Sequence, residues 1–302
     1  MNLALATLEQ GLIYAILAMG VYISFKILNT PDMTVEGSFP FGALITASLL
    51  LRGVHPVVAT LIAMVLGVIP GMISAILAIK LKIMELLAGI LTMTMMYSIN
   101  LRLNGKPNVP FTKSENIFSL IDLGNSYLNK IVILLVVVIL LKILLDRFFK
   151  TKMGYMLITT GDNETLVKAL GESANKYKIL GLGLANGLVA LSGSLFAQSL
   201  KFGDTQMGIG VLVIALASII IGDTLFRERN ISGTTRAIMG AVIYKVIGTL
   251  AIEAGLSPHD LKLINGIIVI GFIAYNNSYA HIKKQFTGGR KDAEDNKLEE
   301  GI

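Results

Sequence analysis

The chain has 302 residues, of which 54% are hydrophobic and 15% are charged, and its mean hydropathy is +0.71. Soluble domains carry about 25% charged residues, so this composition excludes a soluble enzyme, a disordered protein and a nucleic-acid-binding module. It indicates a polytopic α-helical membrane protein, in which the net charge of +6 reflects basic cytoplasmic loops rather than an anionic partner. The chain contains no cysteine, which excludes disulfides and thiolate-bound metals.

Nine apolar segments approach the length of about 20 residues that a helix needs to cross the hydrocarbon core. They lie at residues 3–28, 37–51, 54–79, 83–101, 131–149, 179–200, 208–226, 237–252 and 263–275. We therefore expect one all-α transmembrane domain over residues 1–276, with polar segments at 102–129 and 150–178. Residues 277–302 are charged and contain glycine, so we expect a disordered tail there.

The distribution of basic residues predicts the orientation. An odd number of spans places the two termini on opposite sides of the membrane. With the N-terminus outside, 17 Lys and Arg residues lie on the inner side and seven on the outer side, which the positive-inside rule favours. We therefore predict N-out, C-in, with an outer segment at 102–129, a cytoplasmic loop at 150–178 and a cytoplasmic tail. No basic residue precedes Lys26, so we expect the first span to be retained rather than cleaved as a signal peptide.

Two segments, 29–49 and 203–219, share one pattern: a polar run with an aspartate, then a glycine, then an apolar helix rich in small residues. They cross the membrane in opposite directions in the predicted topology. Paired broken segments of this kind indicate an inverted repeat around the central pathway of a transporter. We predict that the polar side chains of the two runs and one intramembrane lysine line that pathway: Asn29, Asp32, Thr34, Glu36, Ser38, Asp204, Gln206 and Lys245.

The run 29–36 can also be read as an ordinary cytoplasmic loop. Two observations favour the pathway interpretation. The 15 residues between Glu36 and Arg52 are too few to cross the membrane alone, and the matching pattern recurs in the other half. In either interpretation, Asp32 or Asn29 can cap the helix that follows.

Lys245 lies near the middle of the eighth span, about 12 Å from either end. A charge at that depth is expected to face protein rather than lipid. Three interpretations stay open: a pathway or counter-ion residue, a structural pair with a carboxylate such as Asp32, Glu36 or Asp204, and an offset span that places the lysine nearer the surface. Asn186 also lies within a span, where a hydrogen bond between helices is its expected role.

Residues 162–171 of the cytoplasmic loop have the pattern of a two-turn helix. An N-cap candidate, an acidic first turn, an apolar face and a terminal glycine follow one another. They are, in that order, Asp162 or Asn163; Glu164; Leu166, Ala169 and Leu170; and Gly171. Taken alone, such a helix is either interfacial or a docking element.

Three motifs in this region resemble the cytoplasmic loop of ABC-importer permeases of the branched-chain amino acid and ribose type. They are Gly161-Asp162-Asn163-Glu164, Ala169-Leu170-Gly171 and Asn175-Lys176-Tyr177-Lys178, which leads into a span rich in Gly and Ala. The resemblance extends from Gly11 to Tyr275, and segments 37–49 and 233–248 resemble further motifs of that family. Within the family, run 31–37 is most similar to permeases of tryptophan/tyrosine-type uptake systems.

The resemblance implies a permease that is not itself an enzyme. Two copies, as a homodimer in the bacterial plasma (inner) membrane, would enclose the pathway of a small solute, an aromatic or branched-chain amino acid. Cytoplasmic ATP-binding subunits would dock on the 162–171 helices, and an extracellular substrate-binding lipoprotein would deliver the solute. The chain would contact membrane lipid and no nucleic acid. It contains no P-loop motif, so we expect no cofactor here and ATP on the partner subunit.

Other functions remain as alternatives. An ion-coupled secondary transporter would also show an inverted repeat and intramembrane charges, and a channel or scaffold protein is a third possibility. The 162–171 helix favours the importer, because a secondary transporter needs no rigid cytoplasmic docking helix. We expect neither a catalytic nor a metal site: His55, His259 and His281 are scattered at or outside span ends, and no H-E-x-x-H motif is present.

Overall fold

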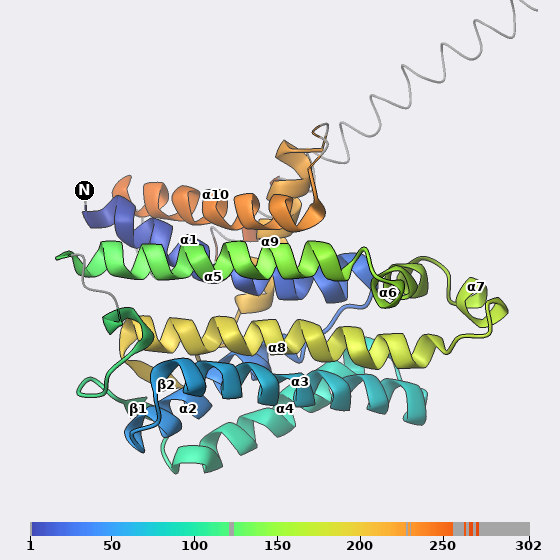
Figure 1. Cartoon of the computed structure of the whole chain (residues 1–302), viewed down its shortest axis with the longest axis horizontal. Helices are drawn as coiled ribbons and strands as arrows, with labels where there is room; N and C mark the ends of the chain where they lie inside the picture. Colours follow the sequence, from blue (N-terminus) through green and yellow to red (C-terminus); the bar gives the residue numbers. More distant parts are fainter. Residues whose placement is uncertain are drawn as a thin grey trace, which may run out of the picture.

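The computed structural model describes residues 2–120, 124–227, 229, 231–255 and five isolated positions between 263 and 271. Within these residues the chain forms a bundle of helices with one small two-stranded sheet. The N-terminus, β1 and β2 lie at one end of the bundle (the β end), whereas α6 and α7 lie at the opposite end (the α7 end; Figure 1). Most of the predicted ninth span, the predicted tail, His259 and His281 lie outside the described residues.

Among the described residues, six helices are long and apolar enough to cross a membrane, and two apolar helices are shorter. The long ones are α1 (Asn2–Tyr22), which continues into the π-helical turn η1 (Ile23–Ile27), α3 (Pro56–Leu81), α4 (Glu85–Asn104), α5 (Ser126–Phe148), α8 (Ala174–Leu200) and α10 (Gly233–Glu253). The short ones are α2 (Val35–Leu51) and α9 (Val211–Leu225). These eight helices correspond to the first eight predicted spans, and the short pair is the pair that the sequence pattern singled out.

The connections between the apolar helices carry the remaining elements: β1 (Asn108–Pro110), η2 (Ile117–Ser119), α6 (Lys152–Asp162), α7 (Glu164–Ala169) and β2 (Phe202–Asp204). β1 and β2 pair antiparallel, with Val109 opposite Gly203. The predicted outer segment therefore joins the chain just before α9 at the β end. The predicted cytoplasmic loop forms α6 and α7 at the other end, so the two polar segments lie on opposite sides of the bundle (Figure 1).

Helix α8 forms the centre of the bundle and packs against α1, α2 and α3. In its most apolar stretch 78% of the residues are buried, compared with 33% in α3 and in α5. Its small residues allow this central position. A Cβ on Gly42 of α2 would lie only 2.0 Å from the carbonyl oxygen of Ala190, so the two backbones are in direct contact. Small residues at helix interfaces in membranes permit this close packing.

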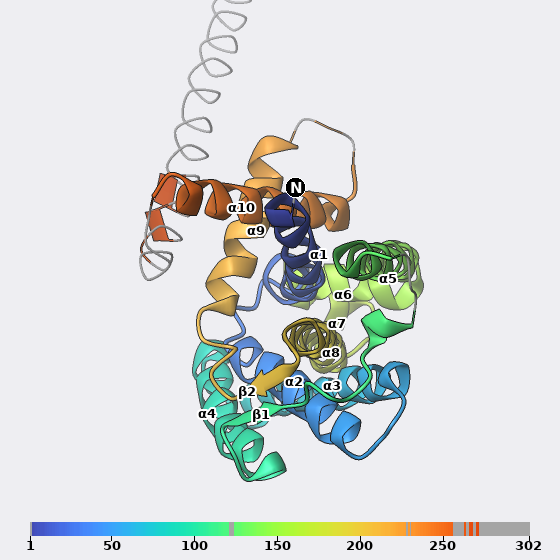
Figure 2. The ribbon, with the colours of Figure 1, turned by 90° about the vertical axis from the view of Figure 1, so that its left-hand side faces the viewer.

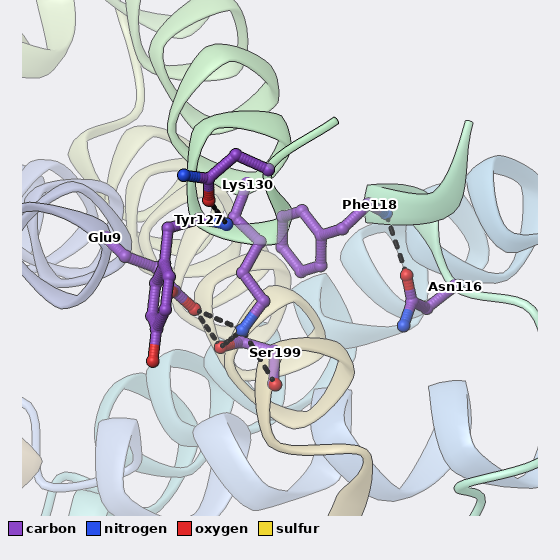
Figure 3. A network of polar contacts seen from close by, with 7 residues as sticks. Glu9, Asn116, Phe118, Tyr127, Lys130 and Ser199 are labelled. Carbon is purple, nitrogen blue, oxygen red and sulfur yellow. Dashed lines mark hydrogen bonds and ion pairs between the residues drawn. The ribbon is translucent and has the colours of Figure 1, made fainter. Parts of the chain in front are cut away.

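A buried charged cluster ties α1, α5 and α8 together near the β end (Figure 3). Glu9 of α1 is only 4% exposed, and its Oε1 lies 3.0 Å from Lys130 Nζ of α5. Lys130 also donates to the backbone oxygen and hydroxyl of Ser199 in α8, and the Ser199 hydroxyl donates to Glu9. A buried charge is tolerated when it is paired and hydrogen-bonded in this way. The sequence analysis did not single out Glu9, because its partners are 121 and 190 residues away.

Candidate functional site

The helical path is interrupted between α1 and α2. In η1 the Leu28 amide donates to the Ile23 carbonyl, and the Thr30 amide then donates to the Ser24 carbonyl, so the helix widens before the chain leaves it. Asn29 has a φ of +53°, in the left-handed region that turns the chain. The chain becomes helical again only at Val35, the first residue of α2.

The polar run before α2 reaches the middle of the bundle. Asp32 is 3% exposed, and its Oδ2 accepts a hydrogen bond from Asn186 Nδ2 at 2.6 Å. Asn186 is the thirteenth of the 27 residues of α8, so this contact lies at half the height of a membrane-spanning helix. The Ser38 hydroxyl donates to the other side of the same amide at 2.7 Å. The predicted role of Asn186 in bonding helices together is confirmed, and irregular backbone at this depth is tolerated because protein covers it.

Asp32 also orders the start of α2. Its Oδ1 accepts a hydrogen bond from the backbone amide of Thr34 at 2.9 Å, just before the helix begins. The N-cap of α2 is Thr34 and has no side-chain cap bond, so the expectation that Asp32 or Asn29 caps this helix is wrong; Asp32 instead fixes the turn just before it. Asn29 is exposed and lies back at η1.

The chain before α9 is held differently. Asp204 ends β2, where its Oδ1 accepts from the Gln206 amide at 2.7 Å and its Oδ2 accepts from Asn108 Nδ2 at 3.0 Å. Gly210, with a φ of +83°, then caps the start of α9. Strand pairing and a local turn therefore fix the start of this run at the β end.

The two broken segments meet at the start of α9. Glu36, in the first turn of α2, accepts a hydrogen bond at its Oε1 from the Gly210 amide at 3.0 Å. A helix N-terminus carries a partial positive charge, so a carboxylate is a favourable partner there. Gly208 makes the approach possible, because a Cβ at that position would lie 1.9 Å from the Glu36 carbonyl oxygen.

A cavity of about 440 Å³, which we call the chamber, lies beside this contact. Its wall combines α2, α4 and the chain before α9: Glu36, Gly37, Pro40, Met93, Thr94, Tyr97, Asn100, Thr205, Gln206 and Ile209. Asn100 donates to the Gly37 carbonyl at 3.2 Å, but its own Oδ1 is buried without a partner among the described residues, as is Thr205 Oγ1. The chamber therefore offers one carboxylate, two unused polar atoms and apolar side chains.

The structure brings only part of the predicted pathway set to the chamber. Glu36 and Gln206 line it, whereas Asp32, Thr34 and Ser38 lie in the buried run towards Asn186. Tyr97, Asn100 and Thr205 also line the chamber, although none of them belongs to the predicted pathway set. Nothing in one sequence marks α4 as a neighbour of α2, although an asparagine inside an apolar span was an available signal.

Lys245 does not line the chamber. Its Nζ donates to Gln10 Oε1 of α1 at 3.2 Å and lies 4.2 Å from the centre of the Tyr14 ring. Of the three interpretations left open for Lys245, a pair with a carboxylate such as Asp32, Glu36 or Asp204 is wrong within the described part of the chain. The physical reason is that α10 packs on α1 and α9 rather than on α2. An amide and an aromatic face stabilise the lysine instead.

Helix α7 follows the sequence prediction closely. Asn163 is the N-cap, and its Oδ1 accepts from the Leu166 amide at 3.1 Å. Gly171 has a φ of +76° and ends the segment. Between them Val167 is fully buried, whereas Leu166 and Leu170 are 48% and 56% exposed. Two apolar side chains thus point away from the body of the protein.

Ion pairs fix α7 on the bundle. Lys178 of α8 lies 2.5 Å from Glu164 of α7 and 2.7 Å from Glu85 of α4. Lys152 of α6 pairs with Glu172 at 3.1 Å. A hydrogen bond from Lys152 holds the pKa of the Glu172 carboxyl below its usual range, and the same contact raises the pKa of Lys152. The Leu166 and Leu170 side chains therefore stand on a fixed support.

Helix α6 connects this support to the broken segment before α2. A Cβ on Gly161 would lie 1.9 Å from the carbonyl oxygen of Ile27, the last residue of η1. The backbone of α6 is thus in direct contact with the turn that leads to Asp32. Direct contacts therefore lead from α6 through η1 to the run that contains Asp32.

The described residues contain no group of three or more His, Asp and Glu side chains placed to hold a metal ion.

Comparison with known proteins gives one consistent result. Over residues 3–273 the chain matches the family described as the permease component of branched-chain amino acid transport systems. The tyrosine transport system permease protein of Clostridioides difficile (strain R20291) is 48% identical over 281 residues, which cover 93% of each chain. The ribose import permease protein of Escherichia coli (strain K12) is 22% identical and covers 89% of this chain and 84% of its own length. No solved structure matches the chain.

Proposed function

The chain belongs to the family of permease components of branched-chain amino acid transport systems, and we propose that two copies of it form the pathway of an amino acid importer. As a permease of an ABC-type system it is a multi-pass protein of the inner membrane whose role is transport. ATP would be bound by a separate cytoplasmic subunit, and an extracellular lipoprotein would deliver the solute. In this arrangement the β end faces outwards and the α7 end faces the cytoplasm.

The observation that carries this proposal is the exposed apolar pair on α7. Leu166 and Leu170 are about half exposed on a helix that ion pairs hold in place. Exposed leucines on a rigid polar support favour a protein interface over a solvent-facing loop. The ATP-binding subunit would cover them, and its movement would pass through α6 to η1, where Gly161 touches Ile27.

The chamber is the proposed solute contact. The Glu36 carboxylate and Asn100 Oδ1 would accept hydrogen bonds from the ammonium group of an amino acid, and the Thr205 hydroxyl would donate to its carboxylate. Tyr97 and Met93 would contact an apolar or aromatic side chain. The 48% identical relative named for tyrosine transport supports an aromatic or branched-chain amino acid as the solute.

Leu170→Asp tests the proposal. A charge at the centre of an apolar interface costs about 2 kcal/mol or more, so capture of the co-expressed ATP-binding subunit by the tagged permease should fall roughly 30-fold. Uptake should fall with it, while membrane insertion should remain normal because Leu170 is exposed. The measurements are co-purification and vanadate-sensitive uptake in the same membranes.

Leu120→Asp is the matched control. Leu120 is 47% exposed but follows η2 at the β end, so this variant should keep the ATP-binding subunit bound. Wild-type capture by Leu170→Asp would contradict the docking role. Uptake that is insensitive to vanadate but is lost when the ion gradient is dissipated would contradict the ATP-driven mechanism.

A further inference from the structure

A second cavity lies away from the chamber. It is a groove of about 580 Å³ between α3 and α5, with α8 as its floor. Its lining is apolar except for one cation. The residues that define its walls are Met64 and Met72 of α3, Leu144 and Phe148 of α5, Leu184 of α8, and the cation Lys176, also of α8.

The groove and the chamber lie on opposite sides of the bundle. Figure 2 shows α3 and α5 on one side of α8, whereas α4 and the chain leading into α9 lie on the other. In the proposed importer the second copy meets the chamber side. The groove side then faces the bilayer, so its occupant must be a membrane component.

The length of the groove matches one leaflet. Along α8 it extends from Lys176 to Leu188, which is about 18 Å at 1.5 Å per residue. Half of a hydrocarbon core of about 30 Å is about 15 Å. One acyl chain of the cytoplasmic leaflet therefore spans the groove from the interface to the bilayer centre.

The apolar walls give no preference for one phospholipid over another, because the acyl chains of all phospholipids are as apolar as leucine. Any preference for one headgroup must come from the residues at the cytoplasmic end of the groove. Lys176 is exposed in the first turn of α8, and Lys150, also exposed, follows Phe148 by two residues. Basic pockets between helices on the cytoplasmic side favour anionic headgroups.

We propose that this groove binds an anionic phospholipid, with one acyl chain between α3 and α5 and the phosphate at Lys176. The headgroup would sit where α5 leads into α6 and where the segment after α7 leads into α8. The lipid would thus contact both connections of the α6–α7 unit, the one from α5 and the one to α8, without contact to the chamber. This goes beyond the transport role, and its test requires no transport measurement.

The absence of tryptophan from the sequence permits a clean experiment. Leu144→Trp places a single fluorophore at the rim of the groove, where the native side chain is already 55% exposed. The full-length variant is reconstituted in vesicles of phosphatidylcholine and phosphatidylglycerol with identical acyl chains, one of the two being brominated in its chains. Quenching then reports which lipid lies next to the tryptophan.

We expect phosphatidylglycerol to associate about fivefold more strongly than phosphatidylcholine at Leu144→Trp, the contribution of one lysine near an anionic headgroup. Adding Lys176→Gln should abolish this preference, so that the lipid composition next to the tryptophan equals the composition of the bulk bilayer. Adding Lys168→Gln, which removes an exposed lysine from α7 instead, should leave it unchanged. Val136→Trp, on the same helix but outside the groove, should report the bulk composition.

Two results would overturn the proposal: a bulk composition at Leu144→Trp, or a preference that survives Lys176→Gln. Neither result bears on the docking of the ATP-binding subunit, which Leu170→Asp tests separately.

Discussion

The runs before α2 and before α9 look alike in sequence but are held in different ways. The first descends to the centre of the bundle, where Asp32 accepts a hydrogen bond from Asn186. The second begins at the β end, where Asp204 bonds the local turn and Asn108, and ends at Gly210, whose amide donates to Glu36. Two runs with similar sequence patterns are therefore anchored to different parts of the protein. The first run, which we call the deep run, follows η1, which is in contact with α6, whereas the second run begins at the strand that pairs with the outer segment.

The largest expected effect separates the two aspartates. Asp32→Ala removes the acceptor of two buried hydrogen bonds and leaves Asn186 less satisfied, which should lower the free energy of unfolding by about 3 kcal/mol. Asp204→Ala should cost less than about 1 kcal/mol because its bonds are exposed to solvent. Thermal unfolding of the purified variants, followed by circular dichroism, measures both. Equal destabilisation would contradict the distinction.

A second change tests the contact between α6 and the deep run. Gly161→Ala would force a methyl group against the carbonyl of Ile27, a strain of about 1–3 kcal/mol that should reduce uptake more than ATP-binding subunit capture. Gly248→Ala in α10 is the control, because its Cβ would meet no heavy atom of the described residues within 4 Å. Normal uptake by Gly161→Ala would remove this route of coupling.

The third change asks what the carboxylate between the two halves does. Glu36→Gln keeps an oxygen that can accept from the Gly210 amide, so α9 should stay in place. Loss of the charge should raise the apparent KM of amino acid uptake about tenfold, as expected for a charge-assisted hydrogen bond of about 1.5 kcal/mol. Gln206→Ala removes a neutral side chain from the same chamber and should change KM less. A fall in maximal rate at constant KM would assign Glu36 to the movement of α9 instead.

The smallest expected effect is a pH dependence of the α7 support. Because Lys152 lowers the pKa of Glu172, this pair stabilises the segment above the ordinary carboxyl pKa of about 4.3. The stabilisation is lost as the pH falls through the lowered pKa. The protection factors of the α7 amides, which correct hydrogen exchange for its intrinsic pH dependence, should therefore fall in acid, and Lys152→Gln should remove that difference. The effect is small because the Lys152 side chain is largely exposed and the Glu172 side chain partly so, which lets solvent screen the pair. An unchanged acid response in the variant would assign it to another group.

Local patterns predicted the features that depend on neighbours in the chain. The first eight spans, the two short helices, the Asn163 cap and the Gly171 stop all follow from apolar length, side-chain capping and left-handed backbone. The hydrogen bond between Asp32 and Asn186 could not be predicted from local patterns, because it joins residues 154 positions apart in the chain. Sequence alone could place Lys245 against protein, but its partner depends on which helix α10 packs against.

The sequence by itself determined that the protein spans a membrane, where its helices are broken and which loop carries the α7 helix, because each of these is a property of a continuous stretch of residues. Only the tertiary structure decided that Glu36 meets the start of α9, that α4 completes the chamber and that Leu166 and Leu170 face outwards. The physical reason is that helix packing brings distant segments together through small residues and side-chain shape, for which a single chain carries no local signal.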